Sequence, residues 1–312
     1  MSWFLYYCVL TPLSYLPLWV LYRLSDLLYV ILYHEVRYRR KITRRNLTTS
    51  FPEKGRKEIK AIERRYYRHL ADLLVEAVHG LNITPQQVMR RYRVVNRELV
   101  NQYYEQGRSV ILMSAHYNNW EYMVLSLNLQ LRHHGVGVGK PLSNKKFERY
   151  LNADRTRYGT EVVDQHNVRQ EMEFFHRNNV PCAYMMLGDQ SPSNPRKSYW
   201  TRFLNQDTAF LYGSEHFARK YGYPVLFYEV RKVRRGHYEI EFGELCPSPA
   251  AVPEGAITQS YVQRLEDLVR RQPEYWLWTH RRWKLRRPAD SNDPQPQQPH
   301  PPIATQTIQH NT

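Results

Sequence analysis

Cysteine is scarce in this chain of 312 residues. The three cysteines, Cys8, Cys182 and Cys246, lie far apart, form no Cys-x-x-Cys spacing and would leave one unpaired in any disulfide arrangement. Disulfide frameworks and structural zinc sites need paired or closely spaced cysteines. We therefore expect the main body of the protein to lie in a reducing compartment and to bind no metal.

Acidic residues are also few, because 29 Asp and Glu face 45 Lys and Arg, which gives a formal net charge of +16. A partner rich in negative charge is expected, and an anionic membrane, a phosphorylated lipid, an acidic carrier protein or nucleic acid would each fit. The sequence contains no recognisable zinc-finger, RNP or GXXG module, which disfavours nucleic acid.

Charged residues are missing altogether from residues 3–22. About 20 helical residues, at roughly 1.5 Å each, are just long enough to cross a hydrocarbon layer. We therefore predict a membrane anchor over residues 1–33, with an N-terminal membrane helix as its main element. Pro12 and Pro17 would kink such a helix, so a re-entrant or interfacial anchor is the alternative.

A basic cluster without any acidic residue follows the apolar segment. Under the positive-inside rule, this cluster places the rest of the chain on the cytoplasmic side of the membrane. Near an anionic surface each such residue contributes about 1 kcal/mol to binding. The cluster consists of Arg37, Arg39, Arg40, Lys41, Arg44 and Arg45.

The remaining pattern predicts an α/β fold over residues 34–287. Short and almost wholly apolar runs at residues 109–114, 181–187 and 224–230 each follow a helix-like stretch. Such alternation is typical of a single domain with a mostly parallel central sheet flanked by helices. Residues 238–242 alternate between apolar and polar in the manner of a half-exposed edge strand.

Helical spacing of apolar residues marks four further segments, and the end of the chain has a different character. The expected helices cover residues 57–80, the stretch after Thr84 and Pro85, and residues 97–106 and 257–271. Residues 288–312 are dense in Pro, Gln and Asn, and such a composition cannot offset its own ordering entropy. We expect a disordered tail there.

The segment with the clearest chemical content is SAHYNNWE at residues 114–121. It places His116 just past a buried strand and Glu121 in the first turn of the next helix, and active sites of α/β proteins gather at the carboxyl ends of strands. A carboxylate there can accept the Nδ1 proton of the imidazole, so that Nε2 acts as a general base on a hydroxyl group. We therefore predict His116 as base and Glu121 as its orienting partner.

The His-x4-Glu box, with Asn119 and Trp120 before the acid, resembles the signature of the lipid A biosynthesis lauroyl/myristoyl acyltransferases. These are relatives of the glycerolipid acyltransferases. Blocks similar to those of the family follow in the expected order up to the closing WLWTHRRWK element at residues 276–284, and the resemblance covers about residues 1–287. It implies a glycerolipid-acyltransferase-like domain.

The resemblance also implies a set of substrate-binding residues. Lys140 stands where the family usually has Arg, which weakens the case for bidentate contacts there. The arginines suit phosphate groups, with ordinary surface charge as the alternative, and Asp189 with Gln190 would line the active site unless they only stabilise a turn. The implied set is Asn119, Lys140, Asn144, Arg155, Arg157, Asp189 and Gln190.

The resemblance implies transfer of a fatty acyl group from an acyl-carrier thioester to a hydroxyl group of a lipid A precursor. No cofactor is implied, because acyl carrier protein or coenzyme A delivers the acyl group as a substrate. The implied partners are acyl carrier protein, an anionic glycolipid and the membrane, on the cytoplasmic face of the bacterial inner membrane. Two alternatives stay open: the same chemistry on another glycolipid, an amino-acid lipid or a lysophospholipid, and a non-catalytic protein that binds anionic lipid or carrier.

Overall fold

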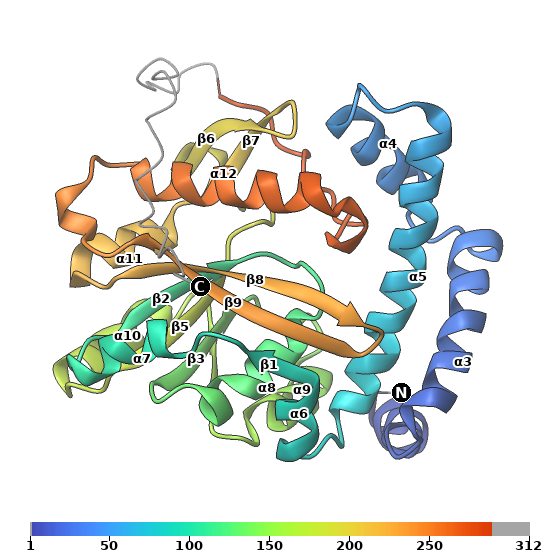
Figure 1. The fold of residues 1–312 in the computed structure, drawn as a ribbon, viewed down its shortest axis with the longest axis horizontal. Coiled ribbons are helices and arrows are strands. Elements are labelled where there is room, and N and C mark those ends of the chain that lie inside the picture. Colours follow the sequence, from blue (N-terminus) through green and yellow to red (C-terminus); the bar gives the residue numbers. More distant parts are fainter. Residues whose placement is uncertain (1, 289–312) are drawn as a thin grey trace, which may run out of the picture.

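A seven-stranded sheet forms the centre of the computed structural model, which describes residues 2–288 (Figure 1). All neighbouring strands run parallel except β8 and β9, which pair antiparallel. The mostly parallel α/β sheet is therefore confirmed. In spatial order the strands are β1 (Tyr92–Val94), β9 (His237–Cys246), β8 (Val225–Arg234), β2 (Val110–Ser114), β5 (Cys182–Leu187), β3 (His134–Gly139) and β4 (Glu161–Asp164).

The three predicted apolar strands are β2, β5 and β8, and they lie side by side in the middle of the sheet. The prediction of an edge strand over residues 238–242 is wrong, because β1 pairs with β9 on its outer side, with Tyr92 opposite Tyr238. A strand of three residues is too short to show a period, which is why β1 has no signal in the sequence.

Alternate side chains of the central strands β2, β5 and β8 enter two separate cores, one on each face of the sheet. On β2, Ile111 and Met113 belong to one core and Val110 and Leu112 to the other. The first core is covered by α10 (Val168–Arg177), α11 (Gly213–Tyr221) and α12 (Ala256–Arg271), and the second by α6 (Pro85–Arg91), α7 (Glu98–Glu105) and α8 (Trp120–Gln130).

Two smaller elements complete this part of the fold. The hairpin of β6 (Ser198–Phe203) and β7 (Gln206–Leu211) packs on α12, where the Phe210 ring meets the edge of the Tyr261 ring. Helix α9 (Lys145–Thr156) joins β3 to β4 and contacts α8. The hairpin and α9 contribute to the first core and to the site, respectively.

The long helix α5 (Arg56–Gly80) stands at one end of the sheet and agrees with the helix predicted over residues 57–80 (Figure 1). Its apolar stripe, which includes Ile59, Ile62 and Tyr66, is buried as the helical spacing requires. The start of α6 also agrees with prediction, because the Thr84 hydroxyl accepts a hydrogen bond from the backbone N–H of Gln87.

The N-terminal segment folds as several short helices and not as one predicted spanning helix. The chain turns at residues 15–17, after which α3 begins, and Leu18 and Leu21 of α3 pack on Val75 of α5. Within residues 2–288 no helix has both the length and the apolar character that a bilayer crossing requires. The segments are α1 (Ser2–Phe4), η1 (Leu5–Leu10), α2 (Thr11–Ser14), α3 (Leu18–Val30), η2 (Ile31–Glu35) and α4 (Arg40–Ser50).

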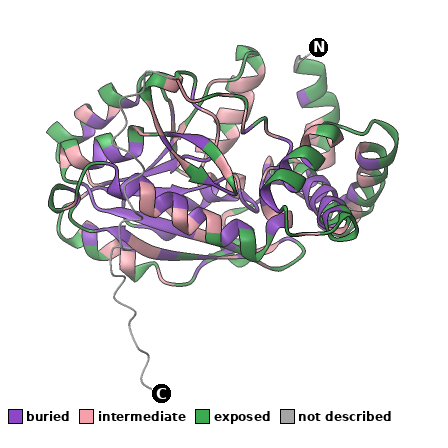
Figure 2. Cartoon of the chain, turned by 90° about the horizontal axis from the view of Figure 1, so that it is seen from above, coloured by how far each residue is buried: buried purple, intermediate pink, exposed green. Residues whose placement is uncertain are grey.

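Burial is uneven across the molecule. Figure 2 shows buried strands at the centre, whereas the outer faces of the N-terminal helices are largely exposed. Several large apolar side chains lie on these outer faces, which is unusual for a surface in contact with water alone. They include Trp3, Phe4, Tyr15, Trp19, Leu27 and Val36.

Candidate active site

Two neighbouring strands of the central sheet end at the same level and bring two polar side chains together. β2 and β5 run parallel with Ser114 opposite Leu187, and His116 and Asp189 follow two residues after these positions. The Nδ1 atom of His116 lies 2.7 Å from Oδ1 of Asp189. The site is therefore at the carboxyl edge of the sheet, as predicted, but its two members come from different strands.

Asp189 is buried and its two carboxylate oxygens each have a partner. Oδ1 faces His116, and Oδ2 accepts a hydrogen bond from the indole N–H of Trp276 at 2.9 Å. Burial alone would raise the pKa of Asp189, but the charge of the imidazole and the hydrogen bonds from His116 and Trp276 outweigh burial and lower this pKa. An ionised Asp189 keeps the proton of His116 on Nδ1.

The other nitrogen of His116 is consequently an acceptor. The side-chain amide of Gln190 lies 3.0 Å from Nε2 and donates to it. The Trp120 ring packs against the imidazole with its centroid 5.1 Å away. His116 is still 19% exposed, so a substrate hydroxyl can reach the side of the ring that Gln190 now occupies. This arrangement suits a general base.

Glu121 lies in the first turn of α8, as predicted, but it does not orient His116. Its carboxylate forms a two-pronged ion pair with Arg155 of α9, at 2.9 Å from Nε to Oε2 and 2.8 Å from Nη2 to Oε1. The prediction that Glu121 accepts the Nδ1 proton is therefore wrong, and Asp189 takes that place. The helix start at Asn119 directs Glu121 toward α9, and the strand end directs Asp189 toward the imidazole.

A cavity of about 540 Å³ opens beside this cluster. Its lining includes apolar residues of α5, the loop after β2 and the chain around residue 280. Of the predicted site residues, Asn119, Glu121 and Gln190 border the cavity. The lining residues are Leu32, Tyr38, Arg39, Leu70, Leu73, Leu74, Ala77, Asn118, Asn119, Trp120, Glu121, Gln190, Leu277, Thr279 and His280.

His280 adds a neutral imidazole to this cavity. Burial lowers its pKa to about 4, an effect that the nearby Asp189 carboxylate only partly opposes. The residue belongs to the closing element at residues 276–284, which is far along the chain from His116 and Asp189. Its place in the cavity could be anticipated only from the resemblance of that element to a known family.

Three of the other predicted substrate-binding residues, Asn119, Asn144 and Arg157, form hydrogen bonds within the fold. Asn119 caps α8, Asn144 accepts from the backbone N–H of Phe147 at the start of α9, and Lys140 is exposed at the end of β3. Arg157 donates to the carbonyl oxygens of Gly80, Leu81 and Ile83 and so holds the end of α5. Contacts of these residues with a substrate stay predictions.

Trp276 is the functional neighbour that the sequence analysis missed. It follows α12 by several residues, and Tyr117 forms an isolated antiparallel bridge with it. Tryptophan in an apolar, basic element is ordinarily assigned to packing, and Trp276 does pack, with 2% of its surface exposed. Its N–H is nevertheless the group that completes the hydrogen bonding of Asp189.

The sequence is similar to those of several known proteins. The chain is 22% identical over 275 residues to the lipid A biosynthesis lauroyltransferase of Escherichia coli, with 87% of each chain covered. It is 23% identical over 261 residues to the palmitoleoyltransferase of lipid A biosynthesis from the same organism, and equally to a lipid A biosynthesis acyltransferase of Shigella flexneri, with 81% of each chain covered. The family profile described as bacterial lipid A biosynthesis acyltransferase matches residues 1–285, so the chain belongs to that family and is an acyltransferase.

Proposed function

We propose that this enzyme transfers a fatty acyl group from an acyl-carrier thioester to a hydroxyl group of a lipid A precursor, with His116 as general base. The observation that carries the proposal is the Asp189–His116 pair, at 2.7 Å, beside a cavity with an apolar wall. The names of the two relatives from Escherichia coli support a lipid A precursor as the acceptor.

The chemistry needs no protein nucleophile. With its proton held on Nδ1 by Asp189, His116 takes the hydroxyl proton of the acceptor on Nε2 as Gln190 moves aside. The acceptor oxygen attacks the thioester carbonyl, a C–O bond forms and the C–S bond breaks. The imidazolium then returns the proton to the departing thiolate. Asp189 stabilises the positive charge that His116 carries between these steps.

The apolar wall of the cavity suits the acyl chain. Leu70, Leu73 and Leu74 of α5 line it together with Leu277 of the closing element. Burying a methylene group contributes about 0.8 kcal/mol, so the binding of a long acyl chain in this space is favourable. The net charge of +16 suits an acidic carrier protein as the donor.

The exposed apolar side chains of the N-terminal helices suggest where the lipid acceptor comes from. Trp3, Phe4 and Trp19 are each at least 60% exposed, and tryptophan is favoured at the boundary between lipid and water. Arg37, Lys41 and other exposed residues of the basic cluster follow them in the chain. This surface would rest on the anionic cytoplasmic face of the bacterial inner membrane without requiring a spanning helix.

The proposal is tested with purified protein, an acyl-carrier thioester and a lipid A precursor, with products read by mass spectrometry. His116→Ala should lower kcat by about 10²- to 10⁴-fold and leave the melting temperature near that of wild type. His216→Ala, which removes an exposed histidine of α11, is the matched control and should keep full activity.

Three outcomes would overturn parts of the proposal. A folded His116→Ala variant with wild-type turnover would exclude His116 as the base. Wild-type protein that transfers acyl groups only to another glycolipid, an amino-acid lipid or a lysophospholipid, offered in parallel, would replace the acceptor. Wild-type protein that binds donor and acceptor but forms no ester would favour the non-catalytic alternative.

A further inference from the structure

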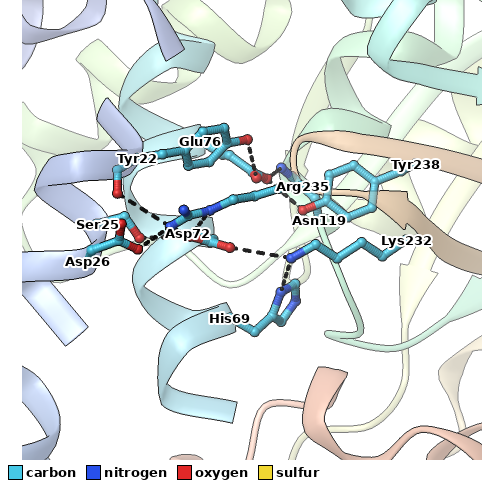
Figure 3. Close-up of polar contacts among 10 residues, drawn as sticks. All are labelled: Tyr22, Ser25, Asp26, His69, Asp72, Glu76, Asn119, Lys232, Arg235 and Tyr238. Atoms are coloured by element: carbon cyan, nitrogen blue, oxygen red, sulfur yellow. Dashed lines mark hydrogen bonds and ion pairs between the residues drawn. The ribbon is translucent and has the colours of Figure 1, made fainter. Parts of the chain in front are cut away.

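A fully buried carboxylate on α5, outside the catalytic pair, collects hydrogen bonds from three distant elements (Figure 3). Tyr22 of α3 donates to Oε1 of Glu76 at 2.9 Å. Asn119 of the loop after β2 and Tyr238 of β9 both donate to Oε2 at 2.7 Å. Glu76 therefore joins the N-terminal helix, the sheet and the loop that carries His116.

The link to Asn119 matters because this side chain is held at both ends. Its Oδ1 accepts a hydrogen bond from the backbone N–H of Tyr122 and so caps the first turn of α8, while its Nδ2 donates to Glu76. That first turn carries Trp120, which packs on the His116 ring, and Glu121, which binds Arg155. The direction in which α8 begins thus sets two of the groups around the site.

The rest of this loop is tied to other parts of the fold. The backbone N–H of Asn118 donates to the carbonyl oxygen of Tyr275, and its side chain donates to that of Val230. Asn119 supplies the side-chain link from the loop to α5, which also lines the cavity. Glu76 is the acceptor of that link.

Burying a carboxylate costs free energy, and a protein with well-packed apolar groups of similar volume at such a position is often as stable or more stable. Burial raises the pKa of Glu76, although hydrogen bonds from Tyr238 and Asn119 oppose this effect. The carboxylate does fix the relative positions of three elements, because one donor from each must reach its two oxygens.

We propose that Glu76 is a positioning residue for acyl transfer: by fixing the amide of Asn119, it sets the start of α8 and thereby the Trp120 wall against which His116 works. The proposal rests on the proposed function, because it is read out through acyl transfer. Because Tyr22 of α3 also donates to Glu76, the packing of α3 on α5 affects the site by the same route.

A swap of donor and acceptor tests the inference. Asn119→Asp keeps the oxygen that caps α8 but replaces the amide donor with a second carboxylate oxygen facing Glu76. Its kcat should fall on the order of 100-fold, with the KM for the acyl donor almost unchanged, because small displacements of reacting groups have effects of this size. Glu76→Gln alone should stay within about fivefold of wild type, since the new amide can turn its oxygen to Asn119 and its nitrogen to Tyr22.

The double variant decides the matter. In Glu76→Gln/Asn119→Asp the hydrogen bond is restored in the opposite sense, so kcat should recover at least about tenfold relative to Asn119→Asp. The matched control is Glu63→Gln, which alters another fully buried carboxylate of α5 that binds Arg40 and Arg44 of α4, and it should leave kcat unchanged.

The outcomes separate this inference from the proposed function. If wild-type protein transfers no acyl group, the proposed function fails. If wild type is active and folded Asn119→Asp keeps its kcat, or the double variant is no more active than Asn119→Asp, the positioning role is overturned. Should Asn119→Asp fail to fold, the double variant is compared with wild type directly: near-normal kcat supports the role, and a loss beyond about 100-fold in the folded protein overturns it.

Discussion

The substitution Asp189→Asn should inactivate the enzyme for a reason that the neighbouring Trp276 dictates. An indole N–H can only donate, so the carbonyl oxygen of the introduced amide must turn toward Trp276, where Oδ2 of Asp189 lies at 2.9 Å in the wild type. The NH2 group of the amide then faces Nδ1 of His116. Nδ1 must become the acceptor, and the proton moves to Nε2, where it blocks the base.

The expected loss combines two effects. The wrong tautomer removes the lone pair that accepts the hydroxyl proton, and the missing charge no longer stabilises the imidazolium. In a catalytic triad the equivalent change lowers kcat by about 10⁴-fold, which corresponds to about 5 kcal/mol of transition-state stabilisation. Because Asp189 is only 3% exposed at its side chain, water cannot replace the lost contact, and we expect a loss of similar size here.

Single-turnover measurements with a saturating acyl-carrier thioester and a lipid A precursor give the rate of the chemical step. Trp276→Phe alone should reduce this rate by less than about tenfold, since the charge of Asp189 remains. In Asp189→Asn/Trp276→Phe the carbonyl of the introduced amide is free to turn toward His116, so this double variant should be at least about tenfold faster than Asp189→Asn. A folded Asp189→Asn variant within about tenfold of wild type would refute the tautomer argument.

Two further predictions concern the surroundings of the site, and a third concerns the buried His133. Glu121→Gln and Arg155→Gln should each lower kcat, and the double variant should be no slower than the slower single variant, because both remove the same ion pair; additive losses would show independent roles. Ala77→Phe should narrow the cavity and lower kcat/KM for long acyl donors more than for short ones, as measured with a series of chain lengths. Burial lowers the pKa of His133 to about 4, against about 6.5 in the unfolded chain. Between these two pH values the unfolded chain binds more protons than the folded protein. The free energy of unfolding therefore decreases as pH falls through this range, by about 1.4 kcal/mol per pH unit for this residue. His133→Gln should therefore flatten the fall in melting temperature between pH 7 and pH 5, and an unchanged pH dependence would contradict this assignment.

The central strands and the long helix could be predicted because their patterns are strong and local. β2, β5 and β8 are apolar runs that both faces of the sheet bury, and α5 carries a continuous stripe of apolar residues. β3 could not be predicted, since its sequence HGVGVG is typical of a loop. Packing requires glycine at one of its positions, because a Cβ atom on Gly135 would lie only 2.3 Å from Oδ1 of Asn128 on α8.

The N-terminal segment shows where composition misleads. An uncharged stretch of about 20 residues satisfies the length criterion for a spanning helix, but that criterion treats the segment as one rigid rod. Pro17 has no N–H to donate to the preceding turn, and the chain starts a new helix, α3, from that point. Its apolar residues then divide between packing on α5 and the exposed outer face.

The exchange of roles between Glu121 and Asp189 has a physical basis that spacing along the chain does not reveal. Five residues separate His116 from Glu121 and 73 separate it from Asp189, so only the pairing of β2 with β5 makes the second partner the nearer one. A carboxylate on a buried strand end is held by its neighbours and shielded from water, which strengthens its interaction with an imidazolium. Glu121, 31% exposed on the first turn of a helix, would lose much of that interaction to solvent. Its carboxylate borders the cavity and is paired instead with Arg155 of α9.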